Sequence, residues 1–171
     1  MKVADDQRWM RRALRLAQRG WGTTSPNPMV GAVLVADGEV IAEGWHQRAG
    51  GQHAEVAAYA DLDRRGRSAQ LSAATMYVTL EPCSTTGRTP PCTDLLRARR
   101  PARLVVGMTD PNPRHAGRGI ALLRAAGVEV QVGVGEARCR ELNAAFVQWI
   151  TTGRPLVLLK LAMTMDGRIA T

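Results

Sequence analysis

Four side chains in two segments have the types and spacing needed to activate water on a metal ion. The first segment is His53-Ala-Glu55, and the second holds Cys83 and Cys92, with eight residues between them. One imidazole and two thiolates are ligands that suit tetrahedral zinc with a fourth position left open. Zinc lowers the pKa of water in such a position from about 16 to about 7, so hydroxide becomes available at neutral pH.

Glu55 follows His53 by two residues at the start of a predicted helix. Residues i and i+2 of a helix point in different directions, so His53 can reach the metal while Glu55 turns toward the bound water. A carboxylate there can take a proton from the water and pass it to a ring nitrogen and a leaving amine. The order His-x-Glu, Pro-Cys and a further Cys resembles the signature of zinc-dependent deaminases of ring amines.

Each part of this pattern also has an ordinary structural explanation. A lone His-x-Glu occurs by chance in many helices, and two nearby cysteines can be small buried hydrophobic residues. The three parts in this order, with Pro82 before the first cysteine, favour zinc-dependent hydrolytic deamination. Cys139 has no such partner nearby and is predicted to lie in the core, and His115 is left without a role.

Alternating strands and helices must position these residues. Because Cys83 follows a strand while His53 and Cys92 begin helices, we expect helix N-termini to stabilise the thiolates at the site. The alternation predicts an α/β fold with a sheet covered on both faces. The predicted strands cover 29–36, 39–44, 75–80, 103–108, 128–134 and 156–161, and the predicted helices cover 6–19, 53–62, 92–99, 119–126 and 136–152.

The composition is that of a globular protein. The 171 residues are 45% hydrophobic and 22% charged, and three cysteines argue against a disulfide framework. No run approaches the roughly 20 apolar residues of a membrane helix, and residues 1–12 lack a secretory signal, so a cytoplasmic location without a membrane partner is expected. The net charge of +8 attracts anions, but no basic patch is interleaved with aromatic residues, which disfavours a nucleic-acid partner.

Over nearly its whole length the chain resembles the deaminase domain of the bacterial bifunctional riboflavin-biosynthesis deaminase/reductase. The eight-residue spacing between the cysteines is specific, since nucleoside and nucleic-acid deaminases of the superfamily generally have Cys-x2-Cys. The resemblance implies a three-layer α/β/α cytidine-deaminase-like fold with a central mixed sheet over residues 1–153. The motifs that carry it are Pro26-Asn-Pro28, Gly44-Trp-His46, His53-Ala-Glu55, Thr79-Leu-Glu-Pro-Cys83, Gly87-Arg-Thr-Pro-Pro-Cys92, Asp110-Pro-Asn-Pro113 and Ala116-Gly-Arg-Gly119.

The same resemblance implies a reaction and a site. The family hydrolyses the 2-amino group of 2,5-diamino-6-ribosylamino-4(3H)-pyrimidinone 5′-phosphate, giving ammonia and 5-amino-6-ribosylaminouracil 5′-phosphate. One zinc ion would be bound by His53, Cys83 and Cys92, with Glu55 as the proton shuttle. The positions that match the substrate pocket are Asn27, His46, Ser84, Asp110 and Asn112, and Arg88 and Thr89 match the loop near the ribose phosphate.

Some of these assignments have competing explanations. Asn and Asp favour turns, so the residues alone favour turn chemistry for Asn27, Asp110 and Asn112. Arg88 in a Gly-Arg-Thr loop suits a phosphate. The family often has His after Pro-Cys-Ser, where this chain has Thr85; this departure would alter phosphate affinity rather than the chemical step.

Residues 154–171 resemble a linker and the first strand of the family's reductase domain. Ala162 matches a position beside NADP(H), which would be a cofactor only if that domain were present. A complete reductase needs far more chain, so we expect no reductase activity from these residues.

Two alternatives stay open from the sequence. One is a nucleoside or nucleic-acid (tRNA) deaminase, encouraged by the positive charge. The other is a non-catalytic zinc-stabilised domain, against which Glu55 argues, since structural zinc sites use four protein ligands. The partners that the sequence leaves open include a second copy of this chain in a homo-oligomer.

Overall fold

A five-stranded mixed sheet forms the centre of the molecule, in a computed structural model that describes residues 3–86 and 90–169. The strand order is β2-β1-β3-β4-β5, with β1 antiparallel to both of its neighbours and β3, β4 and β5 parallel. The strands are β1 (Gly31–Ala36), β2 (Glu39–Trp45), β3 (Thr75–Leu80), β4 (Arg103–Met108) and β5 (Glu129–Val132).

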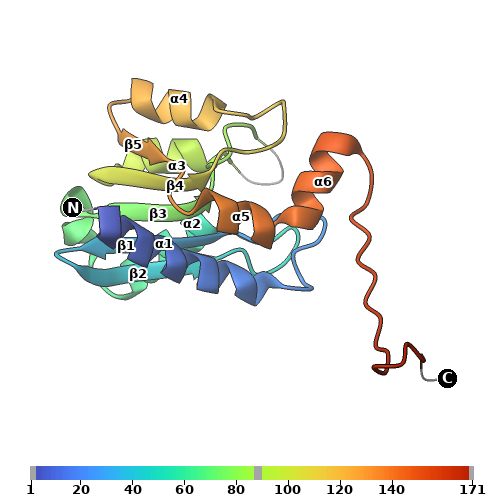
Figure 1. Cartoon of the computed structure of the whole chain (residues 1–171). Helices are drawn as coiled ribbons and strands as arrows, with labels where there is room; N and C mark the ends of the chain where they lie inside the picture. The colour runs from blue at the N-terminus through green and yellow to red at the C-terminus, as the bar shows by residue number, and fades with distance from the viewer. Residues whose placement is uncertain (1–2, 87–89, 170–171) are drawn as a thin grey trace.

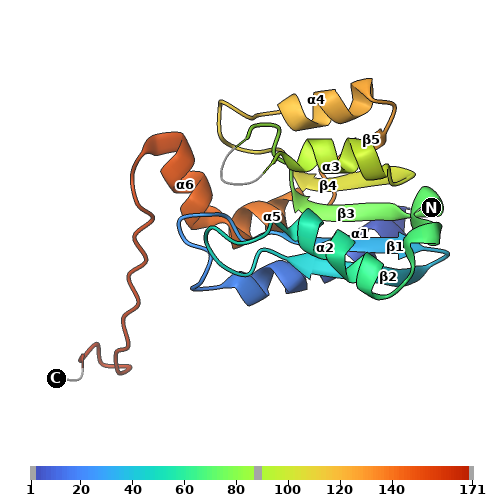
Figure 2. The same cartoon turned by 180° about the vertical axis from the view of Figure 1, so that it is seen from behind.

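Helices cover both faces of this sheet. α1 (Val3–Ala17) and α5 (Glu136–Leu142) lie on one face (Figure 1). α2 (Ala54–Arg64), α3 (Cys92–Arg99) and α4 (Arg118–Ala125) lie on the other, seen in front in Figure 2. All residues of β1 and β3 are buried, as expected for strands covered on both sides. The predicted three-layer α/β/α fold with a mixed sheet is therefore confirmed.

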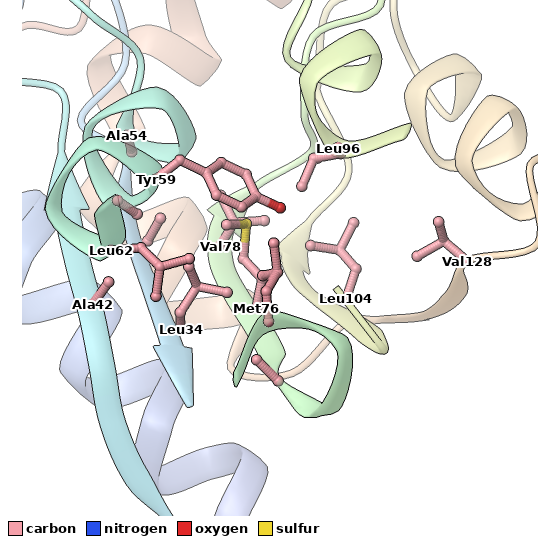
Figure 3. Close-up of a cluster of buried hydrophobic side chains, with 14 of the residues drawn as sticks. Leu34, Ala42, Ala54, Tyr59, Leu62, Met76, Val78, Leu96, Leu104 and Val128 are labelled. Carbon is pink, nitrogen blue, oxygen red and sulfur yellow. The ribbon is translucent and has the colours of Figure 1, made fainter. Parts of the chain in front are cut away.

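Two hydrophobic clusters hold the layers together, one on each face. Figure 3 shows the first cluster, in which Tyr59 and Leu62 of α2 and Leu96 of α3 pack on Met76 and Leu104 of the sheet. The second cluster lies under α1 and α5 and includes Met10, Val33, Tyr77 and Cys139. Cys139 is fully buried, which confirms its predicted place in the core.

Turn chemistry sets the short connections as the sequence predicts. Asp37 and Gly38 join β1 to β2 with φ angles of 52° and 75°, the left-handed values that a two-residue hairpin needs. A 3₁₀ turn, η1 (Gln18–Gly20), ends the first helix, and a second, η2 (Ser68–Ala73), lies in the polar connection before β3.

The predicted long helix over 136–152 is wrong, because it is interrupted at Asn143. The buried Asn143 side chain accepts a hydrogen bond from the backbone N–H of Met29 (2.8 Å) and donates one to the Met29 carbonyl (3.0 Å). An Asn side chain that bonds to backbone outside its helix competes with regular helical geometry. The chain therefore forms α5 and a separate helix, α6 (Ala144–Thr152).

The predicted strand over 156–161 is also absent. These residues form no regular element and are exposed, and the chain from Gly153 onward extends away from the layers (Figure 1). A strand needs a neighbour to complete its hydrogen-bond ladder, and no described strand lies beside this segment. Among the described residues, no helix combines the length and apolar character needed to span a bilayer.

Candidate metal centre and substrate pocket

His53, Cys83 and Cys92 meet at one point beside the sheet. Their ligand atoms all lie within 4.8 Å of one another. The Nδ1 atom of His53 is 3.1 Å from the Cys92 sulfur and 3.5 Å from the Cys83 sulfur. Tetrahedral zinc with bonds of about 2.0–2.3 Å has ligand atoms about 3.5–3.8 Å apart, so small shifts of these side chains complete the geometry. The donor set and its spacing therefore fit zinc, with Nδ1 as the ligand atom of His53.

Two helix N-termini and one strand end position the three ligands. His53 is the residue that precedes α2, and Cys92 is the first residue of α3. Cys83 follows β3 by way of Glu81 and Pro82, and its sulfur accepts a hydrogen bond from the backbone N–H of Cys92 at 3.3 Å. The expectation that helix N-termini support the thiolates is thus confirmed at α3.

The two sulfurs have opposite pKa shifts. The hydrogen bond with the Cys92 thiol lowers the pKa of Cys83, and His53 and the backbone N–H of Cys92 lower it further. The same contact with Cys83, together with burial, raises the pKa of Cys92. These contacts favour the thiolate form at Cys83, and zinc, which binds cysteine as thiolate, would displace the proton of Cys92.

Glu55 faces a cavity next to these ligands. The cavity has a volume of about 250 Å³, and its wall includes His53, Cys83 and Glu55. Glu55 is only 4% exposed, and this burial raises the pKa of its carboxyl group, with a further rise from the nearby Cys83. A carboxyl group in this position, with a raised pKa, has the chemistry of a group that accepts and returns a proton.

Comparison with known proteins assigns this arrangement to a family. Residues 3–108 match the family described as the cytidine and deoxycytidylate deaminase zinc-binding region. The chain belongs to this deaminase family. The predicted resemblance is borne out along with the fold.

Relatives that are about half identical to this deaminase are found among riboflavin biosynthesis proteins. The riboflavin biosynthesis protein RibD of Actinobacillus pleuropneumoniae is 51% identical over 170 residues, which cover 99% of this chain and 44% of the relative. The RibD protein of Escherichia coli K12 is 52% identical over 165 residues, 96% of this chain and 44% of its own length. The chain therefore spans less than half the length of these relatives.

The solved structures agree with this comparison. A deaminase/reductase from Thermotoga maritima, whose name gives diaminohydroxyphosphoribosylaminopyrimidine deaminase and 5-amino-6-(5-phosphoribosylamino)uracil reductase, superimposes with a TM-score of 0.93 at 45% identity. The match covers 98% of this chain and 47% of the Thermotoga chain.

Asn27 and His46 of the deaminase form one hydrogen-bonded unit at the cavity. The buried His46 has its Nδ1 atom 2.8 Å from the carbonyl oxygen of Gln52 and its Nε2 atom 3.1 Å from the side-chain nitrogen of Asn27. Since a carbonyl only accepts, Nδ1 carries the proton, and Nε2 of the neutral ring accepts from Asn27. The contact with His46 uses only the side-chain nitrogen of Asn27, so the side-chain oxygen can accept a hydrogen bond from another group.

Asp110 and Asn112 belong to another segment of the cavity wall and also shape their own loop. Asp110 accepts a hydrogen bond from the Asn112 backbone N–H (2.9 Å), and Asn112 accepts one from Arg114 (3.0 Å). Both side chains line the cavity. The sequence presents a turn-forming role and a place in the pocket as alternatives for Asp110 and Asn112. In the structure, both residues do both.

The remaining predicted residues have different placements. Ser84 follows Cys83 and is half-buried, but it is not one of the described residues that line the cavity. Arg88 and Thr89 lie outside the described residues. Ala162 is exposed in the extended C-terminal segment.

Of the cavity-wall residues that have no role in the sequence prediction, three have a charged, imidazole or aromatic side chain. They are Glu81, His115 and Phe146. Glu81 belongs to the motif Thr79-Leu-Glu-Pro-Cys83, and His115 follows Asn112 by three residues. The sequence neighbours of both residues therefore give a signal that they lie near the site. Phe146 belongs to α6, and no local pattern indicates that this helix reaches the cavity.

Proposed function

We propose that this chain is the deaminase part of a riboflavin-biosynthesis enzyme. Its substrate would be 2,5-diamino-6-ribosylamino-4(3H)-pyrimidinone 5′-phosphate, hydrolysed at the 2-amino group to 5-amino-6-ribosylaminouracil 5′-phosphate and ammonia. The observation that carries the proposal is the meeting of His53, Cys83 and Cys92 with Glu55 at one cavity. The similarity to riboflavin biosynthesis proteins supports this substrate over other ring amines.

The metal-binding side chains and Glu55 would have separate roles in the reaction. Zinc held by His53, Cys83 and Cys92 would supply a water molecule of lowered pKa. Addition of water to C2 of the ring would be followed by cleavage of the bond from C2 to the exocyclic nitrogen, which would leave as ammonia. Glu55 would take one proton from the attacking water and deliver it to the ring nitrogen. It would then carry the remaining hydroxyl proton to the departing amine, so that C2 becomes a carbonyl.

Polar side chains elsewhere in the cavity wall would hold the pyrimidinone ring. The carbonyl oxygen of Asn27, oriented by His46, accepts a hydrogen bond from a ring N–H. Asp110 and Asn112 contact the ring or ribose from another segment of the wall. Ser84, Arg88 and Thr89 are proposed to lie near the ribose phosphate, and a guanidinium there would bind the phosphate by paired charge-assisted hydrogen bonds.

Residues 154–171 are proposed to be a linker and the first strand of a second, reductase domain, with residues 1–153 as the deaminase domain. In support, the similarity to RibD extends over 170 residues of this chain, and the segment from 154 to 169 is exposed beside the packed layers. The role of Ala162 at an NADP(H) site belongs to this proposal and concerns the longer protein, as does any reductase activity.

The test is an assay of ammonia release by the zinc-loaded chain. The diaminopyrimidinone phosphate is compared with cytidine, adenosine and a tRNA under the same conditions. We expect turnover of the pyrimidinone phosphate alone. Deamination of cytidine, adenosine or tRNA instead would favour the alternative deaminase function. No turnover of any substrate, with zinc bound at one ion per chain, would favour a non-catalytic domain.

A further inference from the structure

The carboxylate of Glu81 connects two segments of the cavity wall. One is the segment that leads from β3 to Cys83, and the other is the segment of residues 110–120. Glu81 is 5% exposed and stands between β3 and Cys83. We propose that Glu81 is a positioning residue, which holds the substrate-binding wall of residues 110–120 at a fixed distance from the metal centre. This inference deepens the proposed function and rests on it for its kinetic test.

Four backbone N–H groups of that wall donate hydrogen bonds to the Glu81 side chain. Oε2 accepts from Asp110 at 3.0 Å and from Gly117 at 2.9 Å. Oε1 accepts from Gly119 at 2.9 Å and from Ile120 at 3.3 Å. The backbone N–H of Glu81 itself donates to the carbonyl of Met108 at 2.9 Å, so main chain and side chain bind the same region.

These bonds also explain how α4 begins. Gly117 is the residue that precedes α4, and Gly119 and Ile120 lie in its first turn, where backbone N–H groups have no partner within the helix. Gly117 supplies no side-chain cap, and the first turn of α4 contains no acidic residue. The negative charge that stabilises this helix N-terminus therefore comes from Glu81, which belongs to another element.

Both carboxylate oxygens of Glu81 already accept hydrogen bonds from the protein, which argues against a catalytic role for this side chain. A carboxylate offers about four acceptor positions, and all four are used by the N–H groups of this wall. Glu81 could bind a metal or a substrate group only by releasing some of these four N–H groups. Its effect on the substrate must therefore act through Asp110, Asn112 and His115, which the wall presents to the cavity.

The close approach of the two segments depends on Gly119. A β-carbon at this position would lie 2.2 Å from the carbonyl oxygen of Pro82 and 3.3 Å from Oε1 of Glu81. The contact with the Pro82 backbone is far too short for any β-carbon, so only glycine lets the start of α4 rest directly on the residues that precede Cys83. The wall thus depends on both Glu81 and Gly119.

Glu81→Gln tests the proposal because the amide has nearly the same shape but turns two acceptor positions into donors. Each of these donors would then face a backbone N–H. We expect KM to rise about 10- to 100-fold and kcat to change by less than about threefold, with zinc still at one ion per chain. Glu81→Asp keeps the charge with a shorter reach and should give a smaller rise in KM. Wild-type KM in Glu81→Gln, or loss of activity only in proportion to lost zinc, would overturn the proposal.

Hydrogen exchange provides a second readout that needs no substrate. In Glu81→Gln, the amides of Asp110, Gly117, Gly119 and Ile120 should exchange at least about tenfold faster, while amides of α1 keep their rates. Asp6→Asn is the matched control, since it makes the same chemical change in a buried carboxylate on the opposite face. It should lower stability without changing KM or these four amides. If the wild type fails to turn over the pyrimidinone, the proposed function fails, whereas unchanged exchange in Glu81→Gln would overturn the role of Glu81.

Discussion

Side chains that face the cavity are held by hydrogen bonds within the protein before any substrate arrives. Gln52 fixes the tautomer of His46, and His46 fixes the orientation of the Asn27 amide. Gln52 is also the residue next to His53, so one short chain of contacts links Asn27 to the proposed metal ligand His53. Such fixed groups lose little conformational entropy on binding, which favours affinity and accurate placement.

Glu55→Gln should separate metal binding from catalysis at the level of one residue. The amide keeps the size of the carboxylate but cannot accept the water proton. We expect kcat for ammonia release to fall about 10²- to 10⁴-fold, while zinc content stays at one ion per chain. Stopped ammonia assays and metal analysis on the same preparation measure both quantities.

Glu43→Gln is the control for this change. Glu43 pairs with Arg12 at 2.7 Å and is not among the described residues that line the cavity, so its amide variant should keep wild-type kcat. Near wild-type turnover in Glu55→Gln would rule out the proton-shuttle role.

Secondary-structure elements are tied to one another by a few buried polar contacts. Asp6 of α1 accepts a hydrogen bond from the hydroxyl of Tyr77 in β3 (2.8 Å) and two from Arg103 in β4 (2.8 and 2.9 Å). Burial raises the pKa of Asp6, but these donors outweigh it and hold the pKa below its ordinary value. This cluster fixes α1 across two strands on the face away from the metal centre.

Asp6→Asn is therefore expected to destabilise the fold in a pH-dependent way. Removing one partner of a buried ion pair costs about 3 kcal/mol or more of unfolding free energy. Because the folded pKa is depressed, the contribution of Asp6 is complete above the unfolded pKa of about 4 and is lost as pH falls through the lower folded value. Urea unfolding should show a large difference between wild type and variant at pH 7 that shrinks below pH 4. A difference that stays constant with pH would contradict this account.

The elements themselves were largely predictable, and the failures have physical causes. The hairpin at Asp37-Gly38 and the helix starts at His53 and Cys92 depend on local residue types, which the sequence displays directly. The interruption at Asn143 depends on a contact with Met29, 114 positions away, which no local pattern reveals. The strand expected over 156–161 was inferred from apolar residues alone, although a strand also requires a neighbour.

At the scale of the whole molecule, the sheet order brings the site together. β3 and β4 are parallel neighbours, so the segments that follow them, Glu81 to Cys83 and Asp110 to Asn112, emerge at the same edge. His53 enters from the start of α2 and completes the metal centre. The meeting of His53, Cys83 and Cys92 could be predicted because their types and spacing suit one metal ion. The role of Glu81 could not, since its partners are backbone groups whose positions only the folded chain defines.

The exposed segment after Gly153 has a consequence for how the chain behaves at high concentration. It presents the large apolar side chains of Leu156, Val157, Leu158, Leu159, Leu161, Met163, Met165 and Ile169 to water. An extended apolar segment with unpaired backbone groups can pair with the same segment of another molecule. Light scattering should show residues 1–171 self-associating with rising concentration, and residues 1–153 should associate far less while keeping zinc and turnover. Equal association of the two chains would mean that the contact between molecules lies on the folded layers instead.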